Sequence, residues 1–253
     1  MRPIDILNGV GGATKTAGRG LSKILGAVNP DVWRELIFVS ASAYSMLMPR
    51  REKVVDHGKD EFAPVVLVHG LAGNRGAWWP FRLFMKVLGH RRVYAFGYEK
   101  GTIEEHAALL KDFMVEVCKV TGVQQVDVVA HSLGGLISRY AIQKLGMADS
   151  VRTLITMATP HQGTYAALYA NTTLTLPMRP SSEMINDLNS EDLSAFRNRF
   201  FTLYSDRDVY VLPHEMMTHP AAENIFVPDI SHSQYLLSPQ VFRVVASLLN
   251  PAG

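Results

Sequence analysis

The stretch that decides the fold is Val126-Asp127-Val128-Val129-Ala130-His131-Ser132-Leu133-Gly134-Gly135, which continues as Leu136-Ile137-Ser138-Arg139-Tyr140. Its valine-rich beginning predicts a buried strand, and the residues after Ser132 predict a helix. Ser132 would then lie on a sharp turn, with its hydroxyl exposed and the next backbone N–H free to bind an oxyanion. This is the geometry of a nucleophile. The alternative is a plain serine N-cap in an ordinary strand–helix unit.

Small residues flank Ser132 on both sides, as such a turn requires. The usual form is G-x-S-x-G, because larger side chains two residues from the serine would collide with the adjoining strand and helix. Ala130 occupies the first glycine position and Gly134 the second. On this A-x-S-x-G pattern, the chain resembles the α/β-hydrolase family, and within it the bacterial triacylglycerol lipases and carboxylesterases.

The resemblance extends over residues 61–250 and implies both a fold and an activity. The implied fold is the α/β-hydrolase fold, a mostly parallel doubly wound sheet flanked by helices, with a lid insertion. The implied activity is the hydrolysis of carboxylic esters by a serine nucleophile, through a Ser-His-Asp triad and an acyl-enzyme intermediate. An ester or lipid would be the substrate.

The hydrophobic pattern also indicates an α/β fold. Short apolar runs alternate with stretches of helical periodicity, which is typical of a mostly parallel sheet with helices on both faces. Thr102 and Glu105 form a capping box before a helix over 103–120, and Ser238-Pro239 begins the last helix. Ligands of such sheets bind at the carboxyl ends of the strands. The expected strands are 64–68, 93–96, 126–130, 154–157, 200–204 and 224–227.

Composition excludes several classes of protein. A chain of 253 residues that is 47% hydrophobic can bury one large core. A net charge of +2, without a long Lys/Arg cluster, argues against a nucleic-acid partner. Cys118 is the single cysteine, so no disulfide can form within the chain, and its expected place is a helix. The sequence offers no spacing typical of a metal site, and we expect no cofactor.

The motif His69-Gly70 follows the strand that ends at Val68. The resemblance implies that the next residue, Leu71, donates its backbone N–H to an oxyanion hole, and that Leu133 supplies the second N–H. Both contributions come from the main chain. The alternative is a simple turn.

The acid of the triad is expected after the strand 200–204. Two carboxylates follow it, Asp206 and Asp208. In the family, the acid precedes an apolar residue and a proline, and Asp208, before Val209 and Pro213, matches that spacing better. Asp206 remains the alternative, and otherwise forms a turn.

The base of the triad is expected after the last strand. His232 lies in a polar loop before the final helix, where the family places its general base. Because His131 lies between Ala130 and Ser132, its side chain should point away from the hydroxyl. His161 is part of a Thr-Pro-His turn, which is structural in lipases. The other candidate histidines are His214 and His219.

Residues 163–199 form an apolar segment that is broken by Pro177 and Pro180 and lacks a strand pattern. In lipases the corresponding insertion forms a lid and the walls of the acyl pocket, which favours lipase or long-chain carboxylesterase activity. The alternative is that these side chains pack in the core. The expected substrate-binding residues are Trp78, Trp79, Met178 and Met184.

Residues 1–60 lie outside the resemblance. Asn29-Pro30-Asp31 predicts the start of a helix that runs to Met48 and is too short in its apolar part to span a bilayer. It would pack on the core or over the active site, or contact a lipid surface through the preceding basic residues. No secretory signal is evident, which favours a cytoplasmic or peripheral membrane location over secretion. The oligomeric state stays open.

Other functions share the same residues. A polyester depolymerase, an amidase or an acyltransferase would use the same triad on the same fold. A non-catalytic binding scaffold is the other alternative, but candidates for the nucleophile, acid and base are all present in the order that the fold requires.

Overall fold

The computed structural model describes residues 52–250, except for the seven positions Lys59, Ala72, Asp192, Ser194, Ala195, Arg197 and Asn198. The helix expected between residues 29 and 48 lies outside this range. A sheet with strand order β2-β1-β3-β4-β5-β6 forms the centre, and every neighbouring pair is parallel. Its strands are β1 (Val65–Val68), β2 (Val93–Phe96), β3 (Val126–His131), β4 (Val151–Met157), β5 (Phe200–Tyr204) and β6 (Glu223–Phe226).

The six expected strands are therefore confirmed, with ends that differ from the predicted ones by no more than three residues at any strand. The runs of β-branched residues in β1 and β3 are buried on both faces of the sheet, as a parallel sheet between two helical layers requires. The prediction of a mostly parallel sheet rested on this pattern.

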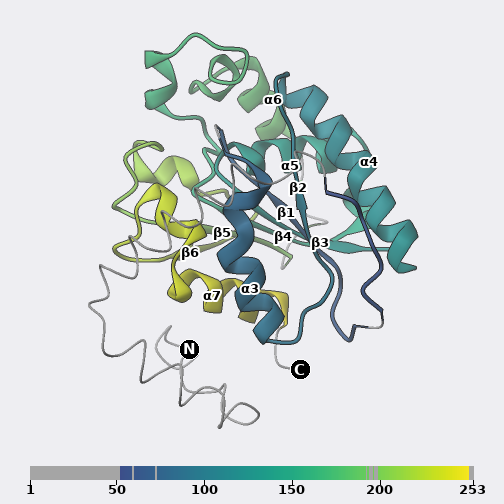
Figure 1. The fold of residues 1–253 in the computed structure, drawn as a ribbon. Coiled ribbons are helices and arrows are strands. Elements are labelled where there is room, and N and C mark those ends of the chain that lie inside the picture. The colour runs from purple at the N-terminus through teal and green to yellow at the C-terminus, as the bar shows by residue number, and fades with distance from the viewer. Residues whose placement is uncertain are drawn as a thin grey trace. The chain divides into compact units, whose positions relative to one another are not determined.

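Helices cover both faces of the sheet (Figure 1). On one face, α4 (Ile103–Thr121) and α5 (Leu133–Lys144) pack against side chains such as Val66 and Val128. On the other face, α3 (Trp79–Val87) and α7 (Pro239–Leu249) pack against side chains such as Leu67. The predicted capping box of Thr102 and Glu105 begins α4.

The strand order reverses between β1 and β3. From β1 the chain moves outward to β2, and it then returns past β1 to β3. The connections after β1 and β3 therefore leave in opposite directions, and ligands of open α/β sheets bind at the carboxyl ends of strands at such a point. The HG motif follows β1 and Ser132 follows β3, so the topology brings both to this point.

Residues upstream of the predicted boundary at residue 61 also pack on the sheet. The backbone N–H of Ala95 in the edge strand β2 donates to Glu52 Oε2 at 2.8 Å, and Tyr94 Oη donates to the carbonyl of Val55 at 2.8 Å. Val54 is buried in the core. The folded unit thus extends at least to residue 52.

The segment predicted as an insertion contains the short helices η4 (Tyr165–Tyr169), η5 (Leu176–Met178) and α6 (Glu183–Ser190). Arg139 of α5 attaches α6 to the body of the fold, because its Nη2 donates to the carbonyl of Leu188 at 2.7 Å. Within the residues that the structure describes, no helix combines the length and hydropathy needed to cross a membrane.

Candidate active site

Three side chains from the ends of three strands form a continuous chain of hydrogen bonds. The Oγ of Ser132 lies 3.0 Å from Nε2 of His232, and Nδ1 of His232 lies 2.7 Å from Oδ2 of Asp208. Ser132 follows β3, Asp208 follows β5, and His232 follows β6. The topology therefore assembles residues that are up to 100 positions apart in the sequence.

Ser132 has a strained backbone, with φ 54° and ψ −126°. A non-glycine residue in this region costs on the order of 1–3 kcal/mol, and the surrounding contacts hold it there. The N–H of Ser132 donates to the carbonyl of Met157 at 2.8 Å. A Cβ at Gly134 would lie 2.6 Å from the carbonyl oxygens of Val68 and His69, so only glycine lets α5 approach β1 this closely.

The HG turn lies directly against the serine. A Cβ at Gly70 would lie 2.8 Å from Cβ of Ser132, so glycine is required there for space. Tyr98 supports the turn from the loop after β2: its Oη donates to the carbonyl of His69 at 2.9 Å, and the two rings stack at 4.1 Å. Burial lowers the pKa of His69 to about 4, so this imidazole is neutral at physiological pH.

The two residues expected to form an oxyanion hole are each next in the chain to a residue of the site: Leu133 follows Ser132, and Leu71 follows Gly70, which lies against Ser132. Leu133 is the first residue of α5, where a backbone N–H has no acceptor within its own helix. Leu71 follows Gly70 in the HG turn, and its side chain is exposed while that of Leu133 is buried. Two main-chain donors next to a nucleophile suit a developing oxyanion.

Asp208 is buried and held as a carboxylate. Its Oδ1 accepts hydrogen bonds from the backbone N–H groups of Tyr210 at 2.8 Å and Val211 at 3.0 Å, which leaves Oδ2 for His232. Burial alone would raise the pKa of Asp208, but these hydrogen bonds and that with His232 outweigh it and leave the pKa below its ordinary value. Asp206, the alternative acid, is exposed at the turn.

The other candidate histidines occupy different places. The Nε2 of His131 donates to the carbonyl of His232, not to the serine hydroxyl. His161 is completely buried between Arg139 and Thr156, and His219 packs beside it at 5.5 Å between ring centroids. Burial lowers the pKa of His161 well below its ordinary value. His161 and His219 thus belong to the packing between α5, α6 and the strand β5.

The expected substrate-binding side chains lie mostly in the core. Trp78 is completely buried against Phe81, and Trp79 is half-buried. Met178 and Met184 belong to the core cluster on the face of α4 and α5. Core packing was the alternative for these residues, and their role toward a substrate stays a prediction.

Sequence reasoning did not single out Tyr210. Its ring is 62% exposed and lies 5.0 Å from the ring of His232. Its backbone is fixed on both sides, because its N–H donates to Asp208 and its carbonyl accepts from Thr164 Oγ1 at 2.8 Å. The sequence signal that could have identified Tyr210 is its position two residues after Asp208, the expected acid.

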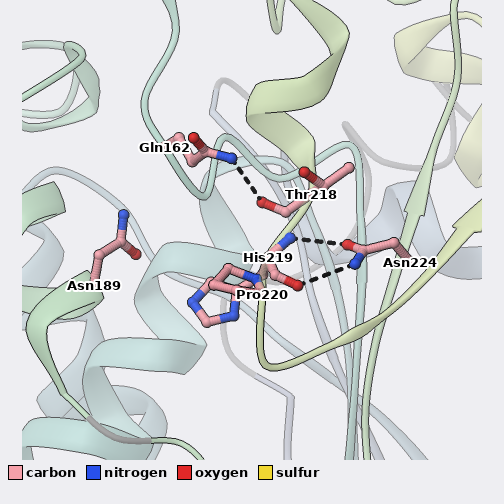
Figure 2. Close-up of a pocket in the computed structure, with 6 residues that line it drawn as sticks. All are labelled: Gln162, Asn189, Thr218, His219, Pro220 and Asn224. Carbon is pink, nitrogen blue, oxygen red and sulfur yellow. Dashed lines mark hydrogen bonds between the residues drawn. The ribbon is translucent and has the colours of Figure 1, made fainter.

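A separate polar cavity of about 430 Å³ lies near the start of β6 (Figure 2). Some of its lining residues bond to one another: Asn224 Oδ1 accepts from the N–H of His219 at 2.8 Å, and Gln162 Nε2 donates to the carbonyl of Thr218 at 3.3 Å. The cavity is lined by Gln162, Asn189, Thr218, His219, Pro220 and Asn224.

Among residues 52–250, where the structure describes them, no group of three or more His, Cys, Asp or Glu side chains could hold a metal ion.

Comparison with known proteins gives consistent matches. The family model for Lipase (class 2) matches residues 62–236. Triacylglycerol lipases of Pseudarthrobacter phenanthrenivorans and Burkholderia plantarii are each 31% identical to this chain in an alignment of 153 residues that covers 56% of this chain. These residues span 44% and 40% of the two relatives, so the match covers less than half of their length.

Solved structures show the same fold. The mature form of Bacillus licheniformis lipase BlEst2 has a TM-score of 0.60 at 20% identity and covers 78% of this chain and 96% of its own. Aspergillus fumigatus lipase B has a TM-score of 0.63 at 17% identity, with coverage of 80% of this chain and 56% of its own. Both are similar to this chain in the arrangement of sheet and helices.

Proposed function

Because the chain belongs to the class 2 lipase family, we propose that it hydrolyses carboxylic esters by means of the Ser132–His232–Asp208 triad. The observation that carries the proposal is the continuous hydrogen-bonded chain from the strained serine to the buried carboxylate. Serine alone is a weak nucleophile at neutral pH, and a base in hydrogen-bond reach with an orienting acid activates it.

In the proposed mechanism, Ser132 Oγ attacks the ester carbonyl while His232 Nε2 accepts its proton. Asp208 holds the imidazole in the tautomer with Nδ1 protonated and stabilises the imidazolium that forms. The N–H groups of Leu71 and Leu133 donate to the oxyanion of the tetrahedral intermediate. His232 then protonates the leaving alcohol, and water hydrolyses the acyl-enzyme by the same steps in reverse. Each step uses groups of this chain and water.

Exposed apolar side chains on the loop that carries Asp208 and on the segment bonded to it support a lipid-like substrate. Thr164 links two of the segments that carry them, because its Oγ1 donates to the carbonyl of Tyr210 and accepts from the N–H of Leu212 at 3.2 Å. Exposed apolar surface beside a catalytic centre suits acyl chains or a lipid surface. The exposed side chains are Tyr165, Leu168, Tyr169, Leu176, Val209, Tyr210 and Leu212.

These side chains occupy the segment 163–199 and the loop after β5. We propose that this segment acts as the lid of the site and contacts the lipid transiently. The relatives named triacylglycerol lipases support a long-chain ester as the substrate class.

The first test is Ser132→Ala with p-nitrophenyl esters of increasing acyl length. We expect kcat/KM to fall by about a thousandfold or more, because removal of a triad nucleophile leaves only the oxyanion hole and binding. Ser247→Ala is the matched control: its hydroxyl donates to the carbonyl of Val244 within α7, outside the proposed lid, and its activity should equal the wild type. The acyl length with the highest kcat/KM separates an esterase from a lipase.

An amide and an aliphatic polyester belong in the same panel, because an amidase, an acyltransferase or a polyester depolymerase would use the same triad. Full activity of Ser132→Ala would refute the assignment of the nucleophile. If the wild-type protein cleaves no ester and takes no label from a phosphonate probe, the proposal that it is an enzyme is refuted. A non-catalytic binding scaffold would then be the remaining alternative.

A further inference from the structure

His131 precedes Ser132 and is buried, yet the mechanism above gives it no role. Its Nε2 lies 2.8 Å from the backbone carbonyl oxygen of His232. Because a carbonyl oxygen only accepts, Nε2 carries the proton and donates it. The two imidazole rings lie 4.7 Å apart, and Tyr235 packs at 6.2 Å on the same ring of His131.

The other nitrogen of this ring faces the HG turn. A Cβ at Gly70 would lie 3.2 Å from Nδ1 of His131 and 2.8 Å from Cβ of Ser132. The imidazole of His131 therefore lies between the turn that carries the expected oxyanion donor and the loop that carries His232. The ring contacts both of these segments, and His131 directly precedes Ser132 in the chain.

We propose that His131 is a positioning residue, which fixes the backbone of His232 so that Nε2 of His232 stays within hydrogen-bond reach of Ser132. This inference rests on the proposed function. Asp208 holds the side chain of His232, and His131 holds its carbonyl, so the base is attached at both ends. A shift of about 1 Å in a reacting group costs on the order of a hundredfold in rate, so loss of the second attachment should lower the rate measurably.

The role requires a neutral imidazole. A proton on Nδ1 of His131 would place a positive charge beside the imidazolium that forms on His232, and would face Gly70. Burial, together with the nearby His232, lowers the pKa of His131 to about 3. The ring therefore donates from Nε2 and keeps Nδ1 unprotonated throughout the neutral range.

The experiment compares His131→Gln with His131→Met on a soluble short-chain p-nitrophenyl ester. Both side chains are unbranched and similar in length, but only Gln carries an N–H that can replace the donor at Nε2. We expect His131→Met to lower kcat by about 10- to 100-fold with KM within about twofold, because positioning acts on the chemical step. His131→Gln should recover most of kcat.

His90→Met is the control for the loss of a buried histidine. His90 precedes β2, at the end of the sheet opposite to the site, and its ring stacks on Phe62 at 4.0 Å. This variant should unfold at a lower urea concentration than the wild type but keep the wild-type kcat. Urea unfolding of all three variants identifies any loss that comes from stability alone.

Two results would overturn the inference: equal kcat for His131→Met and the wild type, or equal losses for His131→Met and His131→Gln in folded protein. In the second case the ring shape would matter and the hydrogen bond would not. An inactive wild type is a different outcome, because it refutes the proposed ester hydrolase itself.

Discussion

At the scale of single residues, the environment of Asp208 differs from that of its neighbour Asp206. Three hydrogen bonds converge on the buried carboxylate of Asp208, two from backbone N–H groups and one from His232. Asp206 is exposed two residues earlier on the same loop. A fixed, desolvated carboxylate orients an imidazole, whereas a solvated one does so weakly.

This difference predicts the outcome of two matched substitutions. Asp208→Asn should lower kcat by about a thousandfold or more with little change in KM, because a neutral amide no longer holds His232 in the required tautomer. Asp206→Asn should stay within about twofold of the wild type. Steady-state kinetics on one ester measures both, and a larger loss for Asp206→Asn would transfer the role of the acid to that residue.

Individual residues of the site differ in how well the sequence predicts them. Ser132, Asp208 and His232 could be named because each follows a recognisable strand and matches the position that the resembled family gives its triad, and the structure brings their side chains together. The position of Trp78 could not be derived in this way, because an aromatic side chain suits a pocket wall and a core equally well. Its complete burial against Phe81 depends on how α3 and α7 pack.

At the scale of elements, the edge strand β2 is covered by the segment that precedes β1. Glu52 accepts from the N–H of Ala95 in this strand, and its carboxylate also binds Arg75 at 3.2 Å and Arg82 at 2.8 Å. An unpaired edge is a site for aggregation, and an ion pair that also satisfies a strand N–H protects it. Arg75 is itself buried, so its carboxylate partner matters more than one at the surface.

We therefore expect Glu52→Ala to lower the free energy of unfolding by about 2 kcal/mol, because it removes the acceptor of Ala95 and the partner of a buried guanidinium. Asp187→Asn, which breaks an exposed pair with Lys144, should change it by less than about 0.5 kcal/mol. Urea denaturation followed by circular dichroism measures both. Equal effects in the two variants would contradict the importance given to burial.

The strands and the helices α4 and α7 could be predicted because their sequences have clear periodicity and capping residues. The segment 163–199 could not, since it folds into short helices without a regular pattern. Its place is set by distant partners such as Arg139, whose guanidinium reaches Leu188 and Asn189. Contacts over about 50 residues leave no local signal in the sequence.

At the scale of the whole molecule, several histidines are buried in the neutral form. Burial lowers the pKa of His69 to about 4 and those of His131 and His219 to about 3. In the unfolded chain each would titrate near pH 6.5. Below that pH the unfolded state binds more protons than the folded state, so acid favours unfolding.

The free energy of unfolding should therefore be constant near pH 8 and fall as the pH drops below 6.5, by at least about 5 kcal/mol per pH unit once these three histidines and the buried His161 are protonated in the unfolded chain. The contribution of Asp208, whose pKa is lowered, is lost at lower pH still. Urea denaturation at several pH values gives this slope. His219→Asn should reduce it by about one quarter, and an equal stability at pH 8 and pH 5 would contradict the prediction.

The fold as a whole was the most predictable feature, because strands alternating with helices allow few arrangements. The parallel sheet and the helices on its two faces follow from that alternation, whereas the strand order is known only from the structure. The cavity near β6 had no counterpart in the sequence analysis, because Gln162, Asn189 and His219 come from three separate segments that only the folded chain joins.

The edge strand β6 carries the base, and this has a consequence for how activity is lost. Glu223, Asn224 and Phe226 of this strand are exposed, whereas β1 and β3 are buried along their whole length. Sub-global opening of a protein starts where the fewest apolar contacts hold it. Detachment of β6 would carry His232 away from Ser132 while the other strands stay paired. We therefore expect catalytic competence and global folding to be two separate equilibria in this molecule, of which the first has the smaller free energy.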